Sequence, residues 1–400
     1  MIKKLEDITA ENPTVQVWKH LRLFLDEEYT QELHCSYLEI DKSSKVFKKD
    51  SRNIKKQVTQ IGYSIRQAEE YFEAASGVDL PTRPLLLYYG ATTLARALVL
   101  LKNNGNYALD RTPTEHRRHG LELVQPHFKG SGLEVFLEAV GCSIQENGSF
   151  PLFYASLVNC MCHVPSETYN VVPNTFGQQL TMNWRGLLNS CETITKEKIS
   201  KIKRNLLEML RVLPDMFTSL KHSGIEPTLC KGSAKGVLTR HFSSPDQGIE
   251  PIRTESVINF IVDSLTDAQR STLLACYTNH PELQVMPTFG INQSTLFLRL
   301  TLPGPDEKQL PMWIPDMVDD LGGNLHYVLD PDSFLGEPAT YYMVLYCLGM
   351  LSRYYPHVWM KAIETSRIAG LCDSFLNFAQ RKFPNLVLDQ MTETRYHIHS

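Results

Sequence analysis

One short segment combines the residue types that phosphate chemistry without a metal requires. Arg111 is followed after four residues by His116, and Arg117, Arg118 and His119 come next. Histidine exchanges protons near neutral pH, and the planar guanidinium of arginine binds phosphate oxygens. On one helix, His116 and His119 would share a face. Metal-independent RNA cleavage could use Arg111, His116 and His119 as candidate catalytic residues and Arg117 and Arg118 as candidate nucleic-acid-binding residues.

The same segment has a plainer interpretation, which we favour. Residues 112–115 (TPTE) have the pattern of a capped helix start. Cations crowded into a first helical turn oppose the helix dipole, unless an anion or an acidic partner binds there. A solvated basic turn, in which His119 and Gly120 have a structural role, accounts for the same residues.

The other polar clusters do not have the spacing of a metal or cofactor site. Cys160 and Cys162 are one residue apart, whereas a zinc knuckle places two to four residues between paired cysteines. Residues 231–236 (KGSAKG) have the composition of a phosphate loop but not its pattern. We therefore expect no metal and no cofactor.

Two further groups of polar residues could be mistaken for sites. Asp316, Asp319 and Asp320 could bind a cation, but the Gly322-Gly323 pair that follows favours a solvated turn. The histidines at positions 397 and 399 are expected in a mobile tail.

The strongest periodic pattern predicts two long helices that pack together. Apolar residues at alternating spacings of four and three form one stripe, namely Ile54, Val58, Ile61, Ile65, Ala68, Phe72 and Ala75. This pattern fits a coiled coil or a bundle helix, and the small alanines favour the bundle. Residues 84–102 are apolar on nearly every face, which predicts a central, buried helix.

Elsewhere the patterns are shorter. A first helix is expected after Pro13, and residues 41–52 are expected to be a loop. Asn147-Gly148 within residues 133–155 predicts a β-hairpin. Residues 179–184 and 296–302 have strand patterns. Further helices are expected from Thr195 to a break at Pro214, and over 338–352 and 358–381.

These elements predict a mainly α fold, a helical bundle with a small antiparallel β element inserted (α+β overall). We expect an N-terminal helical bundle over 1–130 and a β-hairpin with a helical region over 131–225. A flexible loop over 226–255 and a C-terminal helical lobe with a short β-hairpin over 256–400 would follow.

Composition places few limits on function. The chain has 400 residues, of which 42% are hydrophobic and 21% charged, with a formal net charge of −4 and nine cysteines. These values suit a globular protein and argue against a wholly basic nucleic-acid clamp. Scattered cysteines indicate free thiols in a reducing compartment. No apolar run is long enough to span a membrane, so we expect a cytoplasmic protein.

Several segments, in this order, resemble the YaaC-like proteins of bacteria. The resemblance covers about residues 55–365. It implies a shared fold, but it does not imply a particular biochemical activity. The segments that carry it are QAEEYF (67–72), RPLLLYYG (83–90), LARAL (94–98), HG (119–120), SIQENGSF (143–150), LL (187–188) and LSRYYPHVW (351–359).

A second resemblance lies within the first. Residues 88–101 followed by a helix start with Arg and His are similar to the HEPN superfamily of small helical bundles. Many HEPN proteins are metal-independent ribonucleases with an Arg and a His separated by four to six residues, to which Arg111 and His116 correspond.

Two functions therefore remain open. The first, which we favour, is a non-enzymatic macromolecular interaction or regulatory protein. The second is a HEPN-like ribonuclease or nucleic-acid effector in stress response or phage defence. The partner would be a protein or an RNA, with a homodimer as an open alternative and no membrane.

Overall fold

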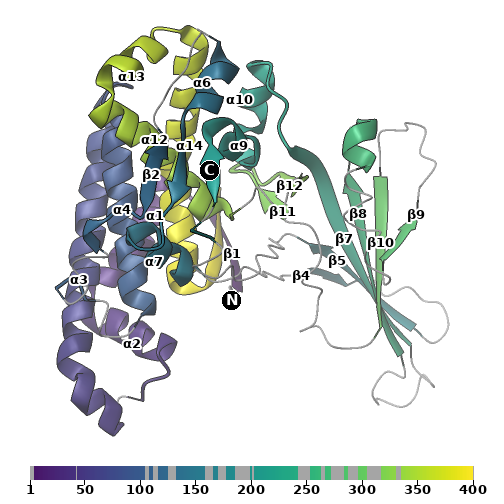
Figure 1. Cartoon of the computed structure of the whole chain (residues 1–400). Coiled ribbons are helices and arrows are strands. Elements are labelled where there is room, and N and C mark those ends of the chain that lie inside the picture. The colour runs from purple at the N-terminus through teal and green to yellow at the C-terminus, as the bar shows by residue number, and fades with distance from the viewer. Residues whose placement is uncertain are drawn as a thin grey trace.

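A computed structural model of the chain combines a bundle of long helices with an antiparallel sheet beside it (Figure 1). It describes residues 4–41, 43–103, 108–110, 116–124, 132–157, 165–169, 177–184, 199–200, 202–241, 253–262, 266–271, 283–286, 296–303, 317–329 and 335–399. The mainly α class with inserted β elements is confirmed. The predictions for Arg111 and for the Cys160–Cys162 pair lie outside these residues.

The helices gather at the two ends of the sequence. Those before residue 160 are α1 (Pro13–Leu21), the 3-10 turn η1 (Arg22–Leu25), α2 (Glu27–Tyr37), α3 (Lys45–Ser76), α4 (Arg83–Lys102), α6 (Leu133–Ala139) and α7 (Ser149–Ser156). Those after residue 200 are α9 (Leu206–Arg211), the 3-10 turn η3 (Pro214–Met216), α10 (Phe217–His222), α12 (Glu337–Tyr354), α13 (Pro356–Ile363) and α14 (Ser366–Thr392).

Helix α3 confirms the predicted stripe. It is unbroken from Lys45 to Ser76 and packs along α4, and all seven stripe residues are buried. Its first turns occupy residues 45–52, where a loop was expected, and the Ser44 hydroxyl accepts from the backbone N–H of Phe47. A serine cap therefore starts the helix inside the polar segment.

Helix α4 is the centre of the bundle. It packs against α3, α7, α12 and α14, which explains why apolar residues cover nearly all its faces. By length and hydropathy alone α4 could cross a membrane, yet 72% of its apolar window is buried inside the protein. Its composition is therefore that of a core helix.

The C-terminal helices pack on α4 from the other side. Pro356 separates α12 from α13, because proline has no N–H to continue a helix. Trp359 is buried, and its indole N–H donates to the carbonyl of Pro81 over 3.2 Å. The single helix expected over 358–381 is wrong, since α13 ends at Ile363 and α14 begins at Ser366.

The hairpin expected at Asn147-Gly148 is also wrong. Helix α6 precedes β3 (Gly141–Ile144), and α7 begins directly after Gly148. Strand β3 pairs instead with β2 (Leu121–Val124) and with β6 (Lys203–Asn205). Strand β6 interrupts the helix expected from Thr195, and Asn205 and Glu208 then form the capping box of α9.

A larger antiparallel sheet occupies the middle of the chain. Its described strands are β4 (Pro165–Tyr169), β5 (Gly177–Trp184), β7 (Leu229–His241), β8 (Arg253–Val262), β9 (Leu283–Met286), β10 (Leu296–Pro303), β11 (Met317–Asp319) and β12 (Leu325–Val328). Strands β5 and β10 confirm two sequence predictions. The flexible loop expected over 226–255 is wrong, because β7 and the start of β8 lie there.

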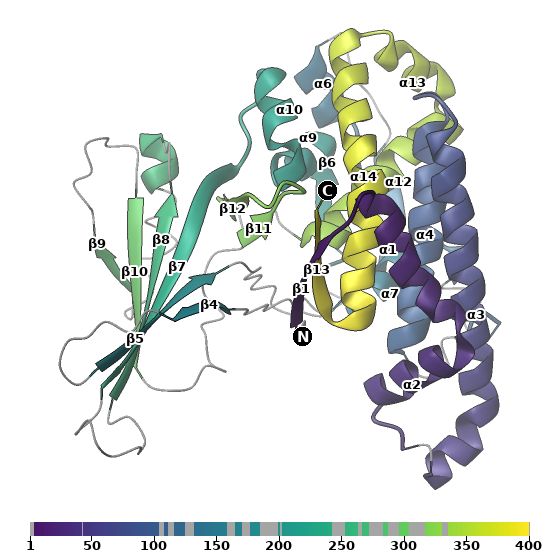
Figure 2. The same ribbon diagram turned by 180° about the vertical axis from the view of Figure 1, so that it is seen from behind.

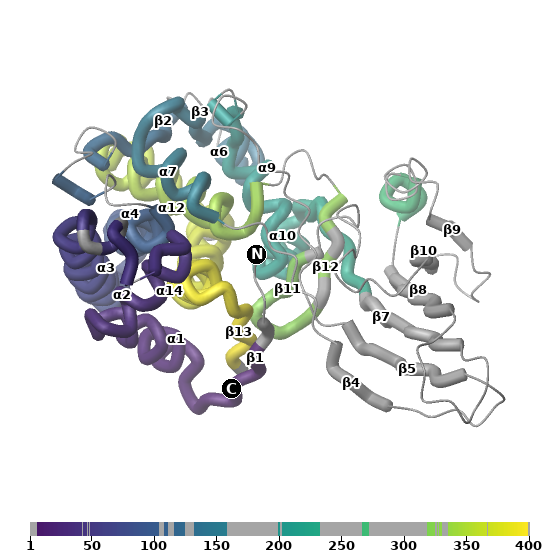
Figure 3. The backbone as a smooth tube through the Cα atoms, turned by 90° about the horizontal axis from the view of Figure 1, so that it is seen from below, coloured from purple at the N-terminus to yellow at the C-terminus, as the bar shows by residue number. Residues whose placement is uncertain are grey.

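Strands β11 and β12 lie where this sheet approaches the bundle, as the view from behind shows (Figure 2). Beside them, β1 (Lys4–Thr9) and β13 (Thr394–His399) pair in parallel (Figure 3). The terminal histidines expected in a mobile tail are therefore in a strand.

One apolar core joins the helices from both ends of the chain. It includes Val17 and Leu21 of α1, Leu98 of α4, Met343 of α12 and Phe383 of α14. The division at residues 130, 225 and 255 stays a prediction, but the two helical parts share this core. Free, buried thiols are confirmed for the described cysteines at positions 35, 142, 230, 347 and 372.

Candidate functional site

Helices α4 and α12 bring together the two most distinctive segments of the sequence, RPLLLYYG and LSRYYPHVW. Gly349 of α12 lies against Tyr88 of α4 so closely that an added Cβ would be 2.9 Å from the tyrosine Cβ. The Ser352 hydroxyl donates to the carbonyl of Pro81 over 2.6 Å. Glycine and serine thus fix the approach that places Tyr88, Tyr89 and Arg353 side by side.

A group of aromatic side chains surrounds Arg353 at the surface. Its guanidinium donates to the Tyr89 hydroxyl and stacks 4.9 Å from the ring centre of Tyr354. The rings of Tyr71 and Tyr89 are 5.8 Å apart. Arg353 is exposed and Tyr354 is 57% exposed, whereas Tyr71 and Tyr89 are partly exposed. We call Tyr71, Tyr89, His119, Arg353 and Tyr354 the aromatic–arginine surface.

His119 forms the inner edge of this surface. Its Nδ1 atom is 2.6 Å from the Tyr88 hydroxyl, and its ring also contacts Tyr346. Burial, with the positive charge of Arg353 as a second cause, lowers the pKa of His119 below its ordinary value. Burial also raises the pKa of Tyr88 well above 10. Tyr88 is therefore a phenol that can donate to a neutral imidazole.

The backbone around His119 is held by the start of α7. The backbone N–H groups of Ser149 and Phe150 donate to the carbonyls of Arg118 and His119 over 2.8 and 3.0 Å. Gly120 has φ +73° and Gly148 has φ +138°, and a Cβ on Gly148 would be 2.3 Å from the Gly120 nitrogen. Both glycines are needed for this close approach. The HG and SIQENGSF segments therefore meet here.

The structure describes two of the three predicted catalytic residues, His116 and His119, whereas Arg111 lies outside the described residues. His116 and Arg117 are in a helical turn, whereas His119 lies beyond it in non-helical backbone. The expectation that His116 and His119 share a helix face is therefore wrong, because the chain leaves the helix to reach Tyr88. Arg117 and Arg118 are exposed. Neither forms an ion pair with the residues that the structure describes.

A second group of charged residues is buried where α14, β13 and β11 meet. Lys382 donates to the carbonyl of Asp319 over 2.6 Å, and its Nζ atom is 3.3 Å from Glu337 and 3.7 Å from Asp215. The Tyr341 hydroxyl donates to Asp215 over 2.7 Å. These side chains belong to four different elements, namely α12, α14, η3 and β11, so they tie the helices to the edge of the sheet.

Arg395 is the second cation of this group. It donates to Asp389 over 2.7 Å and also to Asp319, and Glu337 lies 3.9 Å away. His397 lies 2.9 Å from Asp319. We call Asp215, Asp319, Glu337, Lys382, Asp389, Arg395 and His397 the ionic cluster.

Burial and charge act in opposite directions within the ionic cluster. Burial raises the pKa of Glu337 to about 7 and that of Asp389 to about 6, against the opposing effect of Lys382 or Arg395. Burial also acts to raise the pKa of Asp319, but the charges of Arg395 and Lys382 outweigh burial there. They hold the pKa of Asp319 well below the ordinary value. The cations thus keep Asp319 ionised, while Glu337 and Asp389 titrate nearer to neutral pH.

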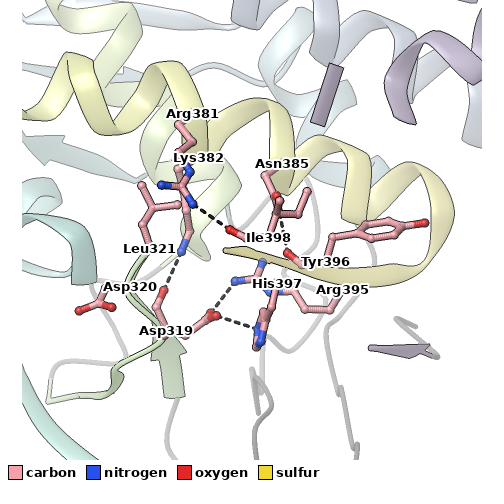
Figure 4. Close-up of a pocket in the computed structure, with 11 residues that line it drawn as sticks. Asp319, Asp320, Leu321, Arg381, Lys382, Asn385, Arg395, Tyr396, His397 and Ile398 are labelled. Carbon is pink, nitrogen blue, oxygen red and sulfur yellow. Dashed lines mark hydrogen bonds and ion pairs between the residues drawn. The ribbon is translucent and has the colours of Figure 1, made fainter. Parts of the chain in front are cut away.

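A small pocket opens beside the ionic cluster (Figure 4). Its volume of about 30 Å³ leaves room for about two water molecules. Asp319, Arg381, Asn385 and His397 are among its lining residues. Within the described ranges, no group of three or more His, Cys, Asp or Glu side chains could hold a metal ion. The pocket is too small for an organic substrate, and the cluster acts as a structural tie.

Sequence reasoning missed the ionic cluster. Asp319 and Asp320 were expected in a solvated turn, yet Asp319 is buried and paired, while Asp320 accepts from the backbone of Gly322 and Asn324. One signal was available in α14, where Lys382, Asn385 and Asp389 follow the three-four spacing of a buried face. Polar residues on such a face need partners from elsewhere in the chain.

A family model described as YaaC-like Protein matches residues 22–391. This range includes every residue of the aromatic–arginine surface and most of the ionic cluster. No curated protein and no solved structure matches the chain.

Proposed function

The chain belongs to the YaaC-like family, and from this premise we propose that it is a non-enzymatic interaction or regulatory protein that binds a macromolecule in the cytoplasm. Its binding site would be the aromatic–arginine surface. The observation that carries the proposal is the exposed Arg353, which stacks on an exposed Tyr354. Tyrosine and arginine are enriched where proteins bind partners, because their planar groups give large contacts at a low entropy cost.

The construction of the surface supports this proposal. Four segments distant in sequence converge on it, and two close glycine contacts, at Gly349 and Gly120, hold them together. Rigid elements beneath an exposed group reduce the entropy lost on binding. Ordinary surface side chains do not need such support.

The geometry gives less support to a HEPN-like ribonuclease in stress response or phage defence. A general acid and a general base must both reach one scissile phosphate. In the described part of the chain, Nδ1 of His119 is bonded to the Tyr88 hydroxyl, and His116 lies on a separate helical turn. Arg111 lies outside the described residues. The ribonuclease therefore stays an untested alternative.

Site-specific crosslinking tests the proposal. A photoreactive benzoylphenylalanine would replace Tyr354 in one variant and Tyr63 in another, in cells that produce the full chain. Tyr63 is 67% exposed on the outer side of α3 and makes a matched control. We expect one macromolecule to be crosslinked from position 354 and not from 63, and to be lost when Arg353→Ala is added.

Two outcomes would contradict the proposal. Equal crosslinking from both positions would mean that Tyr354 meets only random neighbours. A crosslink from position 354 that survives Arg353→Ala would mean that the arginine has no part in binding.

A further inference from the structure

We propose that the aromatic–arginine surface binds a single-stranded nucleic acid, with its phosphates on the arginines and its bases on the tyrosine rings. This inference rests on the proposed function and names the partner class. Proteins that bind single strands combine cationic side chains along the backbone with aromatic rings on which bases stack. The described residues place both features together.

The charges on this side of the molecule favour an anionic partner. Arg353, Arg117 and Arg118 are exposed, and none forms an ion pair with a described carboxylate. Arg117 and Arg118 are within two residues of His119 in the sequence. Arg353 is near His119 as well, since its charge helps to lower the pKa of that histidine. Among the residues that the structure describes, these three arginines leave a local excess of positive charge despite the net charge of −4.

The described carboxylates nearby offset this charge only in part. Glu69 forms an ion pair with Arg22, 2.6 Å away, and Glu73 also acts on Arg22. Glu122 accepts from the neutral side chain of Gln145 and keeps its charge, but it is one carboxylate against three arginines. Glu69 and Glu73 are thus engaged by an arginine outside the surface.

The ring planes at the surface suit bases better than a protein helix. Among the described residues, Arg353 forms a hydrogen bond or a stacking contact with Tyr89 and Tyr354. Both of these side chains are aromatic. Tyr71 extends the group from Tyr89. Stacked bases need ring faces and a guanidinium plane, which these residues supply.

His119 adds a hydrogen-bonding group at the edge of the surface. Its Nδ1 atom is bonded to the Tyr88 hydroxyl, which leaves Nε2 as the ring atom that can face a partner. This nitrogen can form a hydrogen bond with a base edge.

Fluorescence anisotropy with the full-length protein tests the inference. The probes are a labelled 20-nucleotide RNA of mixed sequence, the DNA of the same sequence, and the duplex of each. We expect both single strands to bind more tightly than either duplex. If three arginines contact phosphates, the logarithm of affinity should fall with the logarithm of salt concentration with a slope of about −2.

Matched variants locate the site. Arg353→Ala and Tyr354→Ala should each weaken binding of the single strand about tenfold or more. Arg52→Ala and Tyr63→Ala remove an exposed arginine and an exposed tyrosine of α3 and should leave affinity unchanged. Arg353→Lys keeps the charge but not the stacking plane, so its affinity should lie between those of wild type and Arg353→Ala.

Four results would overturn the inference. They are no binding of either single strand, equal binding of duplex and single strand, equal losses in the control variants, and unchanged affinity in Arg353→Ala and Tyr354→Ala. A protein crosslinked from position 354, with no binding of either strand, would reject the nucleic acid and keep the proposed function. Tight binding of DNA alone or RNA alone would support the inference and identify the source of the strand.

Discussion

The aromatic–arginine surface and the ionic cluster both depend on arginine, but they place it in opposite settings. Arg353 is exposed and touches aromatic rings, whereas Arg395 is buried and touches carboxylates. A buried arginine has its charge neutralised inside the protein, so its loss leaves carboxylates without compensation. An exposed arginine without a carboxylate is available to a partner. The comparison separates residues that hold the fold from residues that can bind.

The largest expected effect tests this separation through stability. Arg395→Met should lower the free energy of unfolding by about 3–5 kcal/mol, because Asp389 and Asp319 would stay buried without their cation. Arg353→Met should change it by less than about 0.5 kcal/mol, as for other surface substitutions. Urea unfolding followed by circular dichroism measures both. Similar losses in the two variants would mean that Arg353 is also structural.

The second prediction concerns pH and belongs to the ionic cluster alone. Glu337 has a folded-state pKa of about 7, above the ordinary value, so the folded state holds its proton more strongly than the unfolded state. Stability should therefore fall as pH rises from about 4.5 to 7, by roughly 1–3 kcal/mol. Asp389, with a pKa of about 6, acts in the same direction.

Glu337→Gln should reduce this loss, because glutamine cannot ionise. The groups that face Glu337 are Lys382, Arg395, Asp319 and Asp215, and all remain in the variant. Melting temperatures measured between pH 4.5 and 7.5 provide the check. A variant with the same pH dependence as wild type would show that another group is responsible.

Local sequence patterns predicted the helices well. The stripe from Ile54 to Ala75 has a period set by the helix itself, and Pro356 lacks the N–H that a helix needs, so both could be read without knowing the fold. Trp359, which follows this break, is buried.

The sites depend on contacts that local patterns do not contain. The ionic cluster joins Asp215, Asp319 and Lys382, which are far apart in the chain. Asn147-Gly148 resembled a hairpin turn, but Gly148 provides the close approach to Gly120 that positions His119. Residues 203–205 continued a helical pattern, yet pairing with β3 made them a strand. In each case a tertiary contact outweighed the local preference.

A smaller effect should appear in the titration of His119. Arg353 helps to lower the pKa of this imidazole, so Arg353→Ala should raise that pKa. Because the folded-state pKa lies below the ordinary value, His119 should cost stability as pH falls below about 6.5, and Arg353→Ala should reduce that cost.

Nuclear magnetic resonance of histidine labelled with nitrogen-15 can follow this titration, with Arg52→Ala as the control. Arg52 lies on α3, whereas the pKa of His119 is lowered by burial and by the charge of Arg353. If the pKa of His119 does not move in Arg353→Ala, the arginine and the histidine do not belong to one electrostatic surface.

The last prediction is that the protein does not cleave RNA, so substitutions of its histidines should have no effect on RNA. Purified protein incubated in EDTA with varied single-stranded RNAs should leave them intact, because His116 and His119 do not share a helix face and Nδ1 of His119 is bonded to Tyr88. His116→Ala and His119→Ala should behave like wild type in this assay. Cleavage by wild type that His116→Ala abolishes, with the melting temperature retained, would establish the ribonuclease instead. Arg111 would then be the first residue to substitute, since a developing negative charge on phosphate needs a cation beside it.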